Sequence, residues 1–115
     1  MKQNLIQTRT FDFAVDTINL YKQMVAKNEY VLSKQLLRSG TSIGANVEEA
    51  IAGQSKKDFL SKMNISLKEA RETNYWLRLF KASKIVDLDF NPSLKESQEL
   101  VNILSAIVKT TKQNS

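Results

Sequence analysis

Apolar residues recur at steps of three and four through four long segments of this chain, and only three short breaks separate the segments. This spacing places the apolar side chains on one face of an α-helix, whereas a half-buried β-strand would alternate apolar and polar residues. The chain contains only three glycines and one proline. They are too few for the many turns of a β-sandwich or barrel but enough for three helix connections, so the pattern predicts an all-α fold.

The four segments predict helices over residues 11–27, 30–52, 56–83 and 92–110, and residues 5 and 6 could extend the first helix. The expected core residues are Phe11, Ala14, Ile18, Tyr21 and Val25; Leu32, Leu36, Ile43, Val47, Ala50 and Ile51; Phe59, Leu60, Met63, Leu67, Ala70, Asn74, Leu77 and Phe80; and Leu94, Val101, Leu104, Ile107 and Val108. Short connections between such helices predict an antiparallel up-down-up-down four-helix bundle. With 115 residues, 42% of them hydrophobic, the chain has material for one domain, residues 1–115.

Residues 39–46 read Ser-Gly-Thr-Ser-Ile-Gly-Ala-Asn, and their composition by itself favours a turn. A glycine inside a helix costs about 1 kcal/mol relative to alanine. The apolar face nevertheless keeps its phase from Leu36 through Ile43 to Ile51, so we expect one continuous helix. Gly40 and Gly44 lie four residues apart on this helix, where two small residues would let another backbone approach closely.

The breaks between the segments carry residues that are typical of helix ends. Those expected to end or cap helices are Asn28, Gly53, Ser55 with Asp58 and, as alternatives at the fourth helix, Asn91 or Ser93 with Glu96, while Pro92 fits the first turn. Asparagine and glycine tolerate the left-handed conformation that ends many helices, and a serine hydroxyl accepts a hydrogen bond from a free backbone N–H group.

The chain contains neither cysteine nor histidine. No disulfide or thiolate site is possible, which fits a reducing compartment, and we expect a cytoplasmic protein. The usual acid–base residue at neutral pH and the commonest zinc ligand are missing, and a di-iron bundle would need Glu-x-x-His pairs. No stretch of about 18 apolar residues could span a bilayer. We therefore expect no catalytic residue, no metal site, no cofactor and no membrane partner.

The formal net charge is +5, and residues 54–84 carry eight basic and three acidic residues, an excess that equals the whole net charge. The candidate nucleic-acid-binding residues on this predicted helix are Lys57, Lys68, Arg71, Arg78, Lys81 and Lys84. Lysine and arginine bind phosphates irrespective of sequence, and an exposed aromatic side chain, either Tyr75 or Trp76, could stack on a base. Trp76 could equally pack at a helix interface, and a basic surface also favours solubility.

A polar seam runs beside the apolar face of the second predicted helix at steps of three and four. It comprises Gln35, Arg38, Ser39, Ser42, Asn46 and Glu49. Such a seam can bind a ligand, but it is more typical of a hydrogen-bond network between helices or of a subunit contact. We expect Arg38 to pair with a carboxylate, either Glu49 or Glu69.

Two pairs of acidic residues have the spacing Glu-x-x-Glu, which places both carboxylates on one face of a helix. They are Glu69 with Glu72 and Glu96 with Glu99. The spacing is similar to that of the magnesium-binding motifs of all-α nucleotide pyrophosphohydrolases. The further aspartate and the ordered basic residues of those enzymes are missing, so a magnesium-dependent pyrophosphohydrolase is a remote alternative.

Several motifs together resemble the bacterial four-helix-bundle family that is encoded by intervening sequences within 23S rRNA genes. The matching residues are Arg38-Ser39-x-x-Ser42-Ile43-x-x-Asn46-x-x-Glu49, then Lys57-Asp58-Phe59-Leu60, Glu69-Ala70-Arg71-Glu72 and Tyr75-Trp76-Leu77. The accessory protein of diversity-generating retroelements resembles the members of this family. The resemblance implies a ring of five subunits and no established catalytic activity. It marks Arg38, Ser42, Asn46, Glu49 and Glu69 as signature positions with a role in architecture or assembly.

The function expected from residues and resemblance together is that of a non-enzymatic homo-oligomer, a pentameric ring that binds RNA or DNA through its third helix. The alternative is a protein-interaction or assembly module whose basic face meets an acidic protein rather than nucleic acid.

Overall fold

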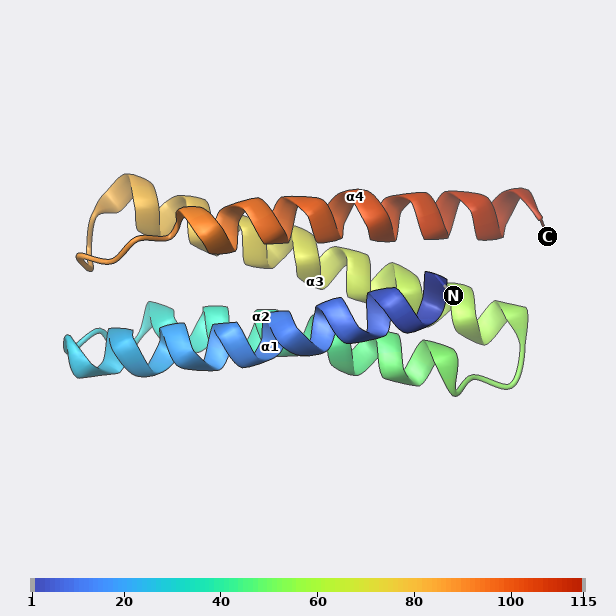
Figure 1. Cartoon of the computed structure of the whole chain (residues 1–115), viewed down its shortest axis with the longest axis horizontal. Coiled ribbons are helices and arrows are strands. Elements are labelled where there is room, and N and C mark those ends of the chain that lie inside the picture. The colour runs from blue at the N-terminus through green and yellow to red at the C-terminus, as the bar shows by residue number, and fades with distance from the viewer. Residues whose placement is uncertain (1, 115) are drawn as a thin grey trace.

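In a computed structural model, the chain forms four antiparallel helices arranged up-down-up-down (Figure 1). They are α1 (Lys2–Ala26), α2 (Leu32–Ile51), α3 (Lys56–Ser83) and α4 (Asn91–Gln113). The structure describes the backbone of residues 2–114 and the side chains of residues 5–114. The molecule is a rod with principal extents of 46 × 22 × 21 Å. The predicted all-α bundle is confirmed.

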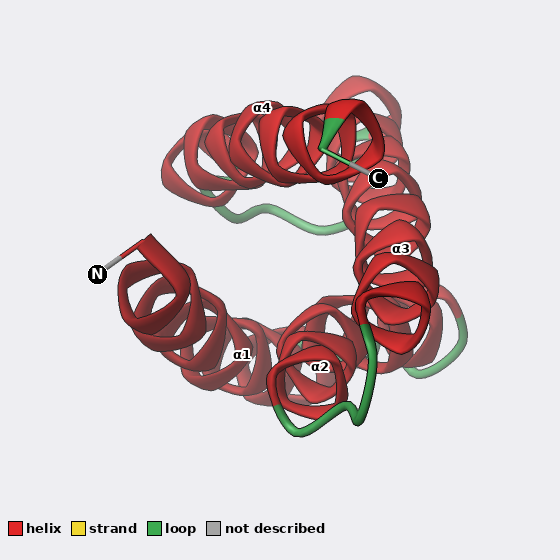
Figure 2. Cartoon of the chain, turned by 90° about the vertical axis from the view of Figure 1, so that its right-hand side faces the viewer, coloured by secondary structure: helices red, strands yellow, loops and turns green. Residues whose placement is uncertain are grey.

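The helices follow one another around the bundle in chain order (Figure 2). α2 packs between α1 and α3, and α3 packs between α2 and α4. α1 and α4 stand at the two ends of this arc and meet over only a short stretch. The seam between α1 and α4 is therefore the least closely packed side of the bundle.

α1 and α4 are longer than the sequence pattern predicted. The extension of the first helix through residues 5 and 6 is confirmed, because α1 already begins at Lys2 and buries Ile6 one turn after its start. α4 continues past residue 110 to Gln113. The bounds of α3 agree with the prediction, and those of α2 differ by one or two residues.

The predicted core face of the first helix was also wrong. Phe11 is 64% exposed and Ile18 is 43% exposed. The buried residues of α1 are instead Ile6, Thr10, Phe13, Thr17, Leu20 and Met24. The two threonines can enter the core because each hydroxyl donates to a carbonyl one turn earlier, Thr10 to Ile6 and Thr17 to Phe13, both at 2.8 Å. This bond satisfies the hydroxyl and leaves the threonine methyl group free to pack.

The other three helices bury most of the residues that the pattern selected. Buried among them are Leu36, Ile43, Val47 and Ala50 on α2, Met63, Ala70, Leu77 and Phe80 on α3, and Val101, Leu104 and Val108 on α4. Ile51, at the end of α2, is 38% exposed, and Leu100 is buried although the pattern did not select it. Phe80 stacks on Phe90 with ring centroids 5.3 Å apart, which closes the core below the α3–α4 loop.

Both glycines of α2 face α1, and the helix runs through them without a break. A Cβ atom on Gly40 would lie 2.6 Å from Cγ2 of Thr17, and one on Gly44 would lie 3.1 Å from the carbonyl oxygen of Thr10. The predicted continuous helix and the predicted close approach of a second backbone are both confirmed. Neither glycine has a positive φ angle, so space rather than backbone conformation requires them.

Two of the predicted helix ends are confirmed. Asn28 adopts the left-handed conformation after α1, with φ of 70°. At the start of α3, the Ser55 hydroxyl accepts a hydrogen bond of 3.0 Å from the Asp58 N–H group. Gly53 also lies at a helix end as expected, directly after Ala52, the C-cap residue of α2, and it does not have a positive φ angle.

The start of α4 differs from both predicted alternatives. Asn91 already belongs to the helix, and its N–H group donates to the carboxylate of Asp89 at 3.0 Å. Glu96 does not reach back to Ser93, because it forms an ion pair with Arg9 of α1 at 2.7 Å. Asp89, two residues before α4, therefore accepts a hydrogen bond from a free N–H group of the first turn, which is the role that the capping motifs suggested for Asn91 or Ser93.

We expect Gly40→Ala to destabilise the protein. The added methyl group would clash with Thr17, and overpacking of this kind costs about 1–3 kcal/mol, more than the gain of about 1 kcal/mol in helix propensity. Urea unfolding measures the difference. Thr17→Ala removes the nearest atoms, so the same glycine substitution should cost less in that background. A Gly40→Ala protein as stable as the wild type would contradict the close contact.

Candidate nucleic-acid interface

All six predicted cations of the third helix lie on the surface. They are Lys57, Lys68, Arg71, Arg78, Lys81 and Lys84, and each is exposed. Considering the side chains of residues 5–114, none of the six forms an ion pair. Arg71 donates only a long hydrogen bond of 3.5 Å to the Ser105 hydroxyl of α4. Their charges are therefore available to an external partner.

Four of the cations lie on the same side of α3. Lys57, Lys68, Arg71 and Arg78 are separated by 11, 3 and 7 residues along the helix. At 3.6 residues per turn, these separations place the four side chains within about 80° of one another around the helix axis. The 21 residues from the first to the last span about 31 Å along the helix. We call these four residues the basic row.

The structure does not bring the other two cations into this row. Lys81 and Lys84 lie at the C-terminal end of α3, around a hollow that Asp87 and Asp89 of the α3–α4 loop also line. Lys84 follows the helix in the left-handed conformation with φ of 54°. Because two carboxylates share their surroundings, Lys81 and Lys84 contribute less to a uniform positive surface than the basic row does.

An aromatic pair lies on α3 next to the basic row. Tyr75 is 47% exposed, and the guanidinium of Arg78 lies 5.8 Å from the centre of its ring. Trp76 packs against Tyr75 in an edge-to-face arrangement with ring centroids 5.1 Å apart, and it is half-buried. Tyr75 is therefore the aromatic side chain that an external base could reach, whereas Trp76 belongs to the helix interface.

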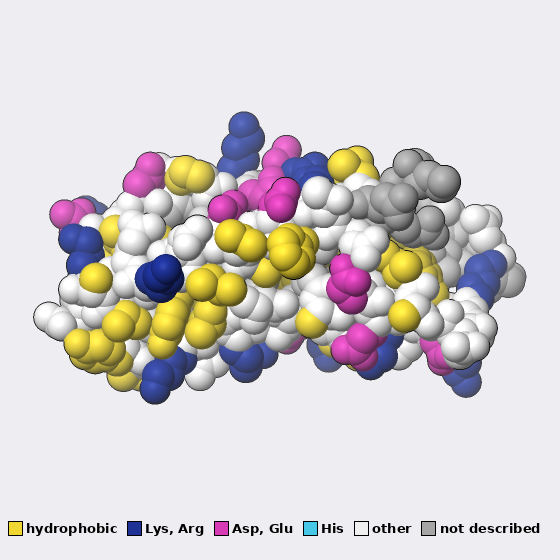
Figure 3. Space-filling view, turned by 60° about the horizontal axis from the view of Figure 1, so that its bottom comes forward, with side chains coloured by type: hydrophobic (Ala, Val, Ile, Leu, Met, Phe, Trp, Pro, Cys, Tyr) yellow, Lys and Arg dark blue, Asp and Glu magenta, His cyan; other side chains and the backbone are white. Residues whose placement is uncertain are grey.

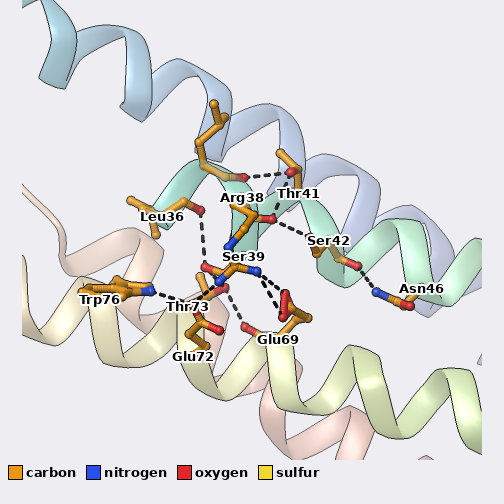
Figure 4. A network of polar contacts seen from close by, with 11 residues as sticks. Leu36, Arg38, Ser39, Thr41, Ser42, Asn46, Glu69, Glu72, Thr73 and Trp76 are labelled. Carbon is orange, nitrogen blue, oxygen red and sulfur yellow. Dashed lines mark hydrogen bonds and ion pairs between the residues drawn. The ribbon is translucent and has the colours of Figure 1, made fainter. Parts of the chain in front are cut away.

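Behind this surface, a polar network joins α2 to α3 (Figure 4). The Arg38 guanidinium of α2 pairs with Glu69 at 3.1 Å and with Glu72. The indole N–H group of Trp76 also donates to Glu72, at 2.9 Å. Of the two partners expected for Arg38, Glu69 is thus confirmed, and Glu72 is a second partner that the sequence pattern had suggested only as a metal ligand.

Buried hydroxyl groups continue the network into the α2–α3 interface. Thr73 donates to the Ser39 hydroxyl at 2.9 Å, and Ser66 donates to the Ile43 carbonyl at 2.8 Å. Sequence reasoning missed Ser66 and Thr73. Their spacing of seven residues, two helical turns within the apolar face of α3, is the signal that could have found them.

The remaining signature residues do not join α2 to α3 in the same way. The Ser42 hydroxyl donates to the Arg38 carbonyl at 2.6 Å, and the Asn46 amide donates to the Ser42 carbonyl at 2.8 Å, both within α2. Glu49 does not pair with Arg38 but with Lys62 of α3, at 2.8 Å. The seam therefore combines bonds within α2 with ion pairs at both ends of the α2–α3 interface.

The network changes the acidity of its central carboxyl. The hydrogen bond from Trp76, followed by that from Arg38, lowers the pKa of Glu72 below its ordinary value, although partial burial acts in the opposite direction. The hydrogen bond to Glu72 in turn raises the pKa of Arg38. Glu72 therefore remains ionised at neutral pH and below, as a partner for the guanidinium.

An arginine from another helix forms ion pairs with both members of each acidic pair that resembled a magnesium-binding motif. Arg38 pairs with Glu69 and Glu72, and Arg9 binds Glu96 at 2.7 Å and Glu99 at 3.2 Å. Within the part of the chain that the structure describes, no group of three or more acidic side chains is arranged to hold a metal ion. Nor is any helix in that part long and apolar enough to cross a membrane.

We expect Glu72→Gln to lower stability by about 1 kcal/mol at pH 7, a value near the lower end for charged hydrogen bonds because the Arg38 side chain is 50% exposed. Because the pKa of Glu72 is lowered in the folded protein, its ionised form contributes its full stabilisation at any pH above the ordinary carboxyl pKa of about 4.3. This stabilisation is lost as the pH falls through the lowered pKa of the folded state. Urea unfolding at pH 7 and pH 3 should therefore show a smaller difference at pH 3.

The matched control is Asp16→Asn, which removes an exposed acid of α1 that forms no ion pair among the described side chains. It should change stability little at either pH. A Glu72→Gln protein that is as stable as the wild type at pH 7 would show that the network contributes nothing to folding.

Comparison with known proteins places this geometry in a family. The family model of the 23S rRNA-intervening sequence protein matches residues 2–106. A solved structure, a protein of unknown function from the S23 ribosomal protein family of Bacteroides thetaiotaomicron, is 46% identical in sequence with a TM-score of 0.87. The match covers 95% of this chain and 99% of that one. The curated proteins contain no match. The chain belongs to the 23S rRNA-intervening sequence protein family.

Proposed function

We propose that this protein is a non-enzymatic scaffold that assembles with copies of itself into a ring of five subunits and binds nucleic acid through α3. The observation that carries the nucleic-acid part is the basic row, four exposed cations in line over about 31 Å. A row of this length can follow several successive phosphates, and lysine and arginine bind phosphates without reading sequence.

Two of the three acids of α3 lie away from the basic row. Glu69 and Glu72 are turned towards α2, where both pair with Arg38. The third acid, Asp58, is exposed in the first turn of α3 beside Lys57, so the positive surface is strongest around Lys68, Arg71 and Arg78. Tyr75 adds an exposed ring beside Arg71 and Arg78, and a base of single-stranded nucleic acid could stack on it.

The proposal of self-assembly is supported by the resemblance to a ring-forming family and by the exposed apolar side chains of α1, among them Phe11, Val15 and Ile18. The signature residues support an architectural role, because Arg38, Glu69 and Glu49 all form ion pairs between α2 and α3. The absence of cysteine from the sequence fits a reducing compartment, and we place the protein in the cytoplasm.

The test compares two variants that lose the same charge at different places. One replaces the basic row, Lys57, Lys68, Arg71 and Arg78, with glutamine. The control replaces four exposed lysines elsewhere, Lys27, Lys34, Lys95 and Lys109, with glutamine. Binding is followed by fluorescence anisotropy with labelled 20-nucleotide RNA and DNA over a series of salt concentrations.

We expect the basic-row variant to bind at least about tenfold more weakly than the wild type, and its logarithmic salt dependence to be smaller by about three to four. The control variant should keep the salt dependence of the wild type. An equal loss of affinity in both variants would mean that net charge, and not the position of the cations, determines binding. No binding by the wild type at low salt would reject nucleic acid and favour an acidic protein as the partner of the basic row.

A further inference from the structure

The side of the bundle on which α1 and α4 meet over only a short stretch carries a groove. Its volume is about 510 Å³, and its apolar lining includes Leu5, Ile6, Phe59, Ile103, Ala106 and Ile107, which come from α1, α3 and α4. Leu5 is 60% exposed although the residues that line the groove with it are mostly apolar. A concave apolar surface of this volume is typical of a binding site.

Acidic side chains continue the groove along the same side of the bundle. Arg9, which lines the groove, pairs with Glu96 at 2.7 Å and with Glu99 at 3.2 Å. Asp12 and Asp16 follow Arg9 by three and seven residues, so both lie within about 60° of it around α1. Both aspartates are exposed and form no ion pair among the described side chains. We call Asp12, Asp16, Glu96 and Glu99 the acidic strip.

The acidic strip is negative although the chain as a whole is positive. Residues 9–16 and 95–99 contain four acids and two cations, Arg9 and Lys95, whereas the net charge of the chain is +5. Acidic side chains gather near the upper edge of the space-filling view, on the side of the bundle where α1 faces α4 (Figure 3). This surface attracts cationic groups and repels phosphates, so it suits a different kind of partner from the basic row.

The groove and the acidic strip follow one another along α4. The α4 residues that line the groove begin at Ile103, and the two acids lie before it, at Glu96 and Glu99. Glu96 and Thr110, which also lines the groove, are 14 residues apart, or about 21 Å along the helix. A partner helix of about 14 residues has this length, so one half of it would face the groove and the other half the acidic strip.

We propose that the groove and the acidic strip together bind a helix of a partner protein, one half of which is apolar and the other half basic. The apolar half fills the groove between α1 and α4. The lysine or arginine side chains of the other half pair with the acidic strip. A helix that lies in an apolar groove is a recurring mode of peptide recognition. The inference does not rest on nucleic-acid binding or on a ring, because the basic row of α3 is not part of this surface.

A second copy of the chain matches this surface less well than such a helix does. On α1, Asp12 and Asp16 lie among the exposed apolar side chains, so a second copy that offered this helix would bring acids against acids. On α3, the exposed Ile65 and Tyr75 lie among the cations of the basic row rather than in a separate half of the helix. A small apolar molecule would fill the groove and leave the acidic strip without a partner.

A designed helical peptide of about 15 residues tests the proposal as a probe. It carries leucine and alanine in one half and lysine and alanine in the other, with the basic half at either end, and a control peptide has glutamate in place of lysine. Fluorescence anisotropy should show that the basic peptide binds in at least one of the two orders and that the acidic peptide does not. Equal binding of both peptides, or no binding of the basic one, would overturn the proposal.

A charge variant tests the acidic strip. It combines Asp12→Asn, Asp16→Asn and Glu99→Gln, and its control removes three exposed acids elsewhere, with Glu48→Gln, Asp58→Asn and Asp87→Asn. The strip variant should bind the basic peptide at least about tenfold more weakly at low salt, and the difference should shrink as the salt concentration rises. The control should bind like the wild type. If both variants lose the same affinity, net charge alone attracts the peptide and the proposal fails.

A neutral substitution tests the groove. Ala106→Gln places a larger polar side chain in the groove, and Ala82→Gln on α3 is its control; both alanines are exposed, so the fold should persist by circular dichroism. Ala106→Gln should weaken binding of the basic peptide by about tenfold at every salt concentration, whereas Ala82→Gln should not. The mass by light scattering should stay that of the wild type. Unchanged affinity would overturn the proposal, and so would a changed mass, which would show that a second copy occupies the groove.

Discussion

The close contact between α1 and α2 decides how the rest of the bundle is arranged. Gly40 and Gly44 have no side chain, so Thr17 and Thr10 of α1 lie directly against α2. This contact sets the rotation of α1 about its own axis, and it is the reason that Phe11 faces outwards. Because α1 lies close to α2, it meets α4 over only a short stretch, where the groove remains. One helix contact thus leaves both the exposed apolar side chains of α1 and the groove beside α4.

The charge on the outer surface of α3 depends in a similar way on its neighbour α2. Arg38 of α2 holds the two carboxylates of Glu69 and Glu72 at the interface, and Trp76 fixes the second of them. The outward side of α3 is left with cations and with Tyr75. A helix that turns two of its three acids towards a neighbouring arginine can present a positive surface even though its sequence contains both signs of charge, which is the physical basis of the proposed binding surface.

Much of this arrangement follows from the sequence, and the failures have physical reasons. The pair of Arg38 with Glu69 was predicted, but Glu49 pairs with Lys62 because these two residues lie nearer to the α2–α3 turn. The core face of α1 was predicted wrongly because apolar residues were ranked above threonine. Burying a threonine costs little free energy when its hydroxyl donates to a carbonyl of its own helix. The glycines opposite bring the backbone of α2 so close to α1 that only a small side chain fits between the two helices.

The sequence by itself determined the all-α class, the unbroken α2 through two glycines and the concentration of positive charge on α3. These properties depend on local propensity, on the period of apolar residues and on composition, which act over a few turns of one helix. Only the tertiary structure decided which of two apolar faces of α1 is buried and which acids of α3 are turned towards α2. That choice depends on the shape and charge of a neighbouring helix, and residues far apart in the chain supply both.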